Sequence, residues 1–154
     1  MKYYVKDYPR PQFVRDNWEN LNGAWDFRFD DDNVGERDRW YEGFEKEHEI
    51  QVPFTYETKL SGIEDERRHD HIWYAKKISV DGSRLEKENF VIHFEGSDFL
   101  TTLWVNGQKA GSHRGGYARF SFDITDLVKD GENELVVRVE DTFDMQQPRG
   151  KQRW

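Results

Sequence analysis

Apolar and polar residues alternate along most of this sequence, and this period of two constrains the fold more than any other feature. Within residues 23–30, three aromatic residues alternate with charged ones. Such alternation is typical of β-strands with one face buried. The same pattern recurs at 89–95, 117–124 and 134–140, and further candidate strands lie at 49–52, 73–80, 100–105 and 108–113.

The residues between these segments are turn formers. Asn106-Gly107 separates two candidate strands and is the pair that a two-residue type I′ hairpin needs, because both positions take a positive φ. Asp81-Gly82, Gly115-Gly116 and Asp130-Gly131 mark further turns, and only 123–129 suggests helix, limited to one turn. About eight short strands without a helical period predict an all-β fold, an antiparallel β-sandwich.

Composition narrows the range of functions. The chain has 154 residues and a net charge of −8, with 6 Trp, 7 Tyr and 11 Phe to fill a core. It is too short for a (β/α)8 barrel of about 250 residues. Its acidity disfavours nucleic-acid binding, and no apolar run is long enough to span a membrane. The lack of cysteine excludes disulfides and thiolate sites and favours a cytoplasmic location.

We expect one domain over 1–154. Residues 1–10 are interpreted as an N-terminal extension and 143–154 as a C-terminal loop or linker, which lacks the strand that would finish the sandwich. The charge-rich runs 36–49 and 64–70 are interpreted as solvated loops.

Several residues could carry chemistry, and each has a plainer interpretation. With 31 Asp and Glu residues, close carboxylate pairs are unavoidable and do not indicate glycoside hydrolysis by themselves. His69 and His71 have the spacing of two metal ligands on one strand face, but no third ligand is evident, so we expect no metal site and no cofactor. His113, before Gly115-Gly116, is expected to form a structural hydrogen bond at that turn.

Aromatic side chains offer a second possibility, because the apolar face of a sugar ring stacks on a flat aromatic ring. Trp40 and Tyr41 lie in a charged stretch, and Trp104 alternates with core residues. Packing in the core remains the preferred interpretation of these rings.

The order of the motifs resembles the amino-terminal domain of glycoside hydrolase family 2, the β-galactosidase and β-glucuronidase family. The resemblance covers residues 10–154 and rests on the joint order of many short motifs. These are the segments 18–27, 50–54, 59–63 and 73–74 in the first half, and 94–96, 104–107, 111–117, 120–125, 131–141 and 148–152 in the second.

The resemblance implies a jelly-roll sandwich related to galactose-binding domains. In the family this domain precedes an immunoglobulin-like domain and a barrel that carries both catalytic glutamates, so the resemblance implies that the chain has no catalytic residue. It also implies that the domain packs on the barrel and helps to shape the sugar pocket, with Asp141, Arg149, Lys151 and Gln152 near that pocket. A homo-oligomer is compatible with this interpretation.

Two alternatives remain open at this stage. The chain could be a stand-alone carbohydrate-binding module, or an interaction domain that pairs an exposed strand edge with another chain.

Overall fold

The computed structural model describes residues 17–142, which form eight β-strands and three short 3₁₀ helices. The strands are β1 (Gly23–Phe29), β2 (His48–Val52), β3 (His71–Val80), β4 (Val91–Phe94), β5 (Leu100–Val105), β6 (Gln108–Arg114), β7 (Phe120–Asp123) and β8 (Gly131–Glu140). The helices are η2 (Trp40–Glu42), η3 (Lys59–Ser61) and η4 (Gly82–Arg84). The predicted strands are all present, and in 123–129, where one helical turn was expected, the Leu127 and Val128 amides both donate to the Ile124 carbonyl in a single turn that continues into no helix.

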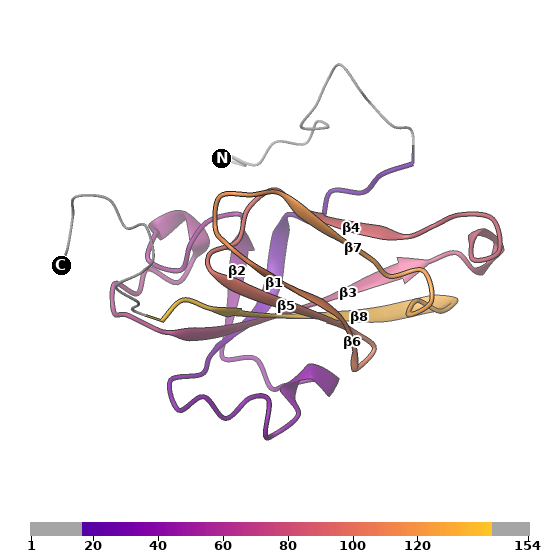
Figure 1. Ribbon diagram of the computed structural model, residues 1–154. Helices are drawn as coiled ribbons and strands as arrows, with labels where there is room; N and C mark the ends of the chain where they lie inside the picture. The colour runs from indigo at the N-terminus through magenta and orange to yellow at the C-terminus, as the bar shows by residue number, and fades with distance from the viewer. Residues whose placement is uncertain (1–16, 143–154) are drawn as a thin grey trace, which may run out of the picture.

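The strands form two antiparallel sheets of unequal size. The larger has six strands in the order β2-β1-β3-β8-β5-β6, and the smaller pairs β4 with β7. The longest pairing joins β3 and β8 over ten residues each, from His71 opposite Glu140 to Val80 opposite Gly131. Figure 1 shows the β4–β7 pair lying over one face of the larger sheet. The predicted antiparallel β-sandwich is confirmed.

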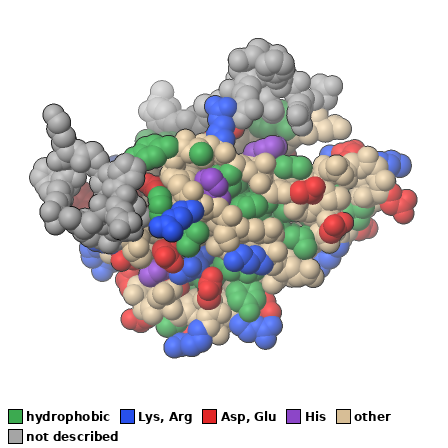
Figure 2. Space-filling view, in the orientation of Figure 1, with side chains coloured by type: hydrophobic (Ala, Val, Ile, Leu, Met, Phe, Trp, Pro, Cys, Tyr) green, Lys and Arg blue, Asp and Glu red, His purple; other side chains and the backbone are tan. Residues whose placement is uncertain are grey.

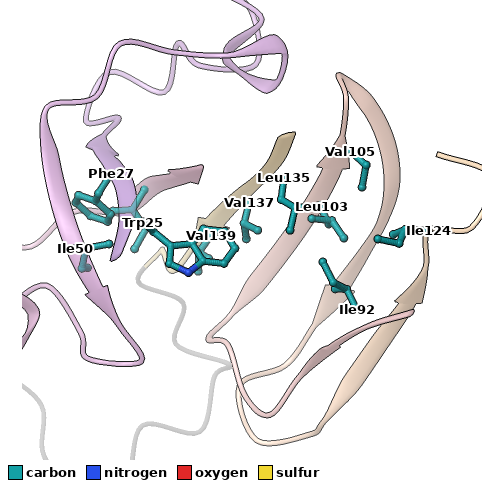
Figure 3. Packing of buried hydrophobic residues seen from close by; sticks show 11 residues of the cluster. Trp25, Phe27, Ile50, Ile92, Leu103, Val105, Ile124, Leu135, Val137 and Val139 are labelled. Atoms are coloured by element: carbon teal, nitrogen blue, oxygen red, sulfur yellow. The ribbon is translucent and has the colours of Figure 1, made fainter. Parts of the chain in front are cut away.

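The core lies between these two sheets. Alternate residues of the large sheet point inward, so Phe27 of β1, Leu103 of β5 and Leu135 of β8 are fully buried. Ile92 of β4 and Ile124 after β7 close the core from the smaller sheet, as Figure 3 shows. Strand periodicity therefore places one residue in two within the sandwich.

A second apolar cluster covers the opposite face of the large sheet. It contains the buried side chains of Trp73, Ala75, Trp104 and Val136. Trp40, Tyr41 and Phe44, from the segment 30–47, pack against it. The indole of Trp104 stacks on Trp73 at a centroid distance of 5.4 Å and on the Tyr41 ring at 5.6 Å. In Figure 1 this segment lies on the side of the large sheet opposite β4 and β7.

This packing corrects one expectation. The charged run 36–49 is not simply a solvated loop, because its aromatic residues cover the outer face of the sheet and its end enters β2. Trp40, Tyr41 and Trp104 accordingly serve as packing residues, in agreement with the plainer of their two interpretations. The run 64–70 is also only partly solvated, since the side chain of His69 is 3% exposed.

Asp30 anchors the covering segment to the sheet. The residue is 2% exposed, and its carboxylate accepts hydrogen bonds from the amides of Val34 at 2.7 Å and Gly35 at 3.0 Å. The Trp73 indole N–H donates a third bond to the same carboxylate at 2.9 Å. Buried charge is tolerated only when its hydrogen bonds are satisfied, and this carboxylate meets that condition.

Asn106 and Asn133 connect the turn after β5 to the turn before β8 through hydrogen bonds. Asn106 and Gly107 have φ values of 51° and 79°, so the predicted type I′ turn is confirmed. The fully buried Asn133 side chain accepts hydrogen bonds at 2.8 Å from Asn106 Nδ2 and from the Lys129 amide. Its own amide donates to the carbonyl groups of Lys129 and Gly131.

Side chains of both charge signs are interspersed on the face shown in Figure 2. Most ion pairs are exposed, as is the pair between Lys77 and Glu132 at 2.7 Å, and such pairs contribute little to stability. Folding energy therefore comes mainly from the two apolar clusters.

Within residues 17–142, no helix has the length and apolar character needed to cross a membrane.

Replacement of Asn133 by alanine should lower the free energy of unfolding by about 3 kcal/mol, because it leaves buried backbone groups unsatisfied. Urea denaturation followed by far-ultraviolet circular dichroism measures this change. Glu132→Ala is the matched control, since its side chain is 65% exposed, and should change stability by less than about 1 kcal/mol. Equal effects of the two variants would contradict the role assigned to Asn133.

Asp30→Ala should destabilise the protein by about 3 kcal/mol, because three donors lose their acceptor. The neighbouring Asp32→Ala removes an exposed carboxylate and should stay within about 0.5 kcal/mol of the parent. Limited proteolysis should cut the Asp30→Ala variant within 31–47 first. Cleavage elsewhere before this segment would show that Asp30 does not anchor it.

Candidate functional site

A cleft of about 490 Å³ opens on the inner face of the large sheet, beside the end of β4. Its floor is apolar and is formed by Trp25 of β1, Ile72 and Tyr74 of β3, and Val137 and Val139 of β8. These residues face inward because they occupy alternate positions of their strands. In Figure 3 the Trp25 indole lies between Phe27 and Ile50 on one side and Val137 and Val139 on the other.

One wall of the cleft is the segment 52–57, which follows β2. Pro53 has no backbone N–H and ends the strand, and the chain then turns with hydrogen bonds from the Phe54 amide to the Gln51 carbonyl and from the Thr58 amide to the Thr55 carbonyl. The Val52-Pro53 peptide bond is cis. This turn brings Phe54 and Tyr56 to the cleft.

The opposite wall comes from the connections of the small sheet. Phe94 ends β4, and Gly96, Ser97 and Asp98 follow it along the rim. Gly116 closes this side, where a Cβ atom would collide with the Asp98 side chain. The glycine predicted to mark an irregular turn is therefore required by close packing at the cleft.

His69 packs against the wall formed by the segment 52–57. Its ring stacks on Phe29 at a centroid distance of 3.7 Å, and its Nδ1 lies 2.7 Å from Asp31 Oδ1. Its backbone amide donates to the Tyr56 hydroxyl at 3.3 Å. Burial raises the pKa of Tyr56 and of Tyr74 above the ordinary value. Both tyrosines therefore keep their hydroxyl protons at neutral pH and can donate a hydrogen bond.

The rim is acidic. Glu57, Asp98 and Asp141 line the cleft, and its lining residues within 17–142 include neither Lys nor Arg. The backbone of Asp141 is held by a hydrogen bond from its amide to the Asp70 carbonyl at 2.9 Å. An apolar aromatic floor beside carboxylate acceptors suits a ligand that has both hydroxyl groups and an apolar face.

The structure describes only one of the predicted site residues. Asp141 follows β8 and lies at the cleft, as just described. Arg149, Lys151 and Gln152 lie outside the described residues. Sequence reasoning missed Trp25, Tyr56 and Glu57 as cleft residues, because nothing in the alternation reveals that the turn after β2 folds over the same floor.

The histidines singled out from the sequence have separate surroundings. His71 Nε2 lies 3.5 Å from Glu140 Oε2, whereas His69 contacts Asp31, and residues 17–142 contain no cluster of three His, Asp or Glu side chains that could hold a metal. The His113 ring stacks on Phe120 at 4.0 Å, and its buried Nε2 has no hydrogen-bond partner. Nε2 of His113 therefore does not form the expected hydrogen bond, and the ring instead packs on Phe120.

Sequence comparison connects this fold to a known family. Residues 18–149 match the family model for the sugar binding domain of glycosyl hydrolases family 2. A putative beta-glucuronidase of Formosa agariphila is 31% identical over 142 residues, which are 89% of this chain and 16% of the relative. A beta-galactosidase of Thermoanaerobacter pseudethanolicus is 33% identical over 123 residues, which are 79% of this chain and 15% of the relative.

Solved structures agree with the sequence matches. A Lactobacillus rhamnosus beta-glucuronidase superimposes with a TM-score of 0.73 at 28% identity, over 82% of this chain and 21% of that one. A beta-glucuronidase from an uncultured Clostridium gives a TM-score of 0.72 at 26% identity, over 86% of this chain and 24% of that one. The chain thus spans a quarter or less of the length of these relatives. It belongs to glycosyl hydrolases family 2, and it corresponds to the sugar binding domain of that family.

Proposed function

We propose that this chain is the non-catalytic amino-terminal domain of a retaining glycoside hydrolase of the β-galactosidase or β-glucuronidase type. The observation that carries the proposal is the unequal coverage of the matches: they span most of this chain but about a sixth of the named relatives. The proposed partners are the catalytic barrel and the immunoglobulin-like domain of the same enzyme. A jelly-roll topology and a cytoplasmic location belong to the same proposal.

The proposed role of the cleft is to form one wall of the sugar pocket. Asp141 lies on its rim, and a carboxylate there accepts hydrogen bonds from sugar hydroxyl groups, which orients the ring without taking part in bond cleavage. The acid and the nucleophile of the retaining reaction would be carboxylates of the barrel. Arg149, Lys151 and Gln152 are proposed to lie near the same pocket.

Asp141→Asn should lower kcat/KM of the complete enzyme about 10- to 100-fold, because a charged acceptor for a sugar hydroxyl becomes a neutral amide of the same shape. Steady-state kinetics with nitrophenyl glycosides measure the effect. Glu132→Gln, at the other end of β8, is the matched control and should leave kcat/KM unchanged. If Asp141→Asn reduces only the melting temperature, the residue is structural and its proposed role is wrong.

The isolated chain should hydrolyse no nitrophenyl galactoside or glucuronide, because both reactive carboxylates would lie in the barrel. Turnover that follows the purified chain through successive columns would refute the proposal.

A stand-alone carbohydrate-binding module should bind galactose, glucuronate or an oligosaccharide with a Kd of about 1 mM or lower. We expect titration calorimetry to detect no such binding.

A further inference from the structure

Asn106-Gly107 is one of two Asn-Gly pairs in the chain, the other being Asn22-Gly23, and this dipeptide is chemically labile. The glycine nitrogen can attack Cγ of the asparagine side chain, because glycine lacks the Cβ atom that hinders such an approach. The N–Cγ bond forms and the Cγ–Nδ2 bond breaks. The amide proton passes to a solvent base, and the side-chain nitrogen takes up a proton and leaves as ammonia. Water then opens the succinimide at either carbonyl carbon and gives aspartate or isoaspartate.

In the folded chain, hydrogen bonds hold both ends of the Asn106 side-chain amide. Its Nδ2 donates to the Leu127 carbonyl at 2.9 Å and to Asn133 Oδ1 at 2.8 Å. Its Oδ1 accepts a bond from the Glu134 backbone amide at 3.0 Å. Closure of the succinimide ring draws Cγ to the Gly107 nitrogen and detaches Nδ2, so the reaction cannot proceed while all three side-chain bonds persist.

The neighbours of the turn are themselves fixed. Asn133 is fully buried and is held by hydrogen bonds to the backbone of Lys129. Glu42 of η2 lies close to the turn, because a Cβ atom at Gly107 would stand 3.2 Å from Glu42 Cγ. The side chain of Asn106 therefore becomes free to react only when the turn opens locally, and such opening carries its own free-energy cost in a folded protein.

We propose that Asn106 is a site of spontaneous deamidation that this network protects, so that modification follows local opening of the β5–β6 turn. Either product disables the turn irreversibly, because the ammonia is lost. Aspartate has no amide protons to donate to the oxygens of Leu127 and Asn133. Isoaspartate adds a methylene group to the backbone, which a two-residue type I′ turn cannot accommodate. The proposal concerns chemical damage to the fold and does not depend on the proposed enzymatic role.

The rates of deamidation in the folded and the unfolded chain test the protection. The full chain is incubated at mildly alkaline pH with and without guanidinium chloride, and mass spectrometry of the peptide that contains Asn106 follows the conversion of amide to acid. We expect the reaction at Asn106 to be about 100-fold slower in the folded chain, because three hydrogen bonds must open first. Equal rates in the folded and unfolded chain would overturn the proposal.

Asn133→Ala tests whether the network is responsible. It removes an acceptor of the Asn106 side chain and should accelerate deamidation of Asn106 in the folded chain about 10-fold. Glu132→Ala, at a side chain that is 65% exposed, is the matched control and should leave this rate unchanged. Equal rates at Asn106 in the two variants, or an equal acceleration at Asn22 in Asn133→Ala, would overturn the assignment to the turn. If Asn133→Ala does not fold, the folded and unfolded parent chains still decide.

Asn106→Asp tests the consequence of the modification. The melting temperature should fall by about 5 °C or more, because the turn loses two donated hydrogen bonds. Gln108→Glu is the matched control, since it adds the same charge at an exposed position of the same hairpin, and should change the melting temperature by less than about 2 °C. An equal fall in both variants would attribute the effect to charge alone and would refute the claim that deamidation disables the turn.

Discussion

The large sheet buries both of its faces along β3 and β8, and the remaining structure is arranged around this requirement. In β8, Leu135 and Val137 face the sandwich core, while Val136 faces the opposite side and is 1% exposed. A strand that is apolar on both faces needs two covers. The β4–β7 pair and the segment 52–57, which flanks the cleft, together supply the first, and the segment 30–47 supplies the second.

The strands and their turns follow from local sequence patterns. Alternation locates each strand because side chains in a strand point to opposite faces, and Asn106-Gly107 specifies its hairpin because few residue pairs accept two positive φ values. The second cover could not be predicted in this way. Most residues in 36–49 are charged or polar, and its few aromatic residues find Trp73 and Trp104 only after distant strands have paired.

Asp141 is the one cleft residue that was predicted as a site residue from the sequence. Asp141 was reached through the family resemblance, which the match over residues 18–149 confirms, and the structure places it on the cleft. Trp25 was recognisable as a core residue, but its position at the floor of a cleft depends on the turn after β2 and on the connection after β4. These segments are far apart in the chain, so no local pattern predicts that they meet.

The stacked rings on the outer face also have an optical consequence. The Trp73 and Trp104 indoles lie 5.4 Å apart with their planes inclined by 22°, a separation at which the electronic transitions of neighbouring chromophores couple. Such coupling splits an absorption band into an exciton couplet whose sign depends on the mutual twist of the rings. The protein thus contains an intrinsic spectroscopic reporter of its sheet geometry, which requires no added label.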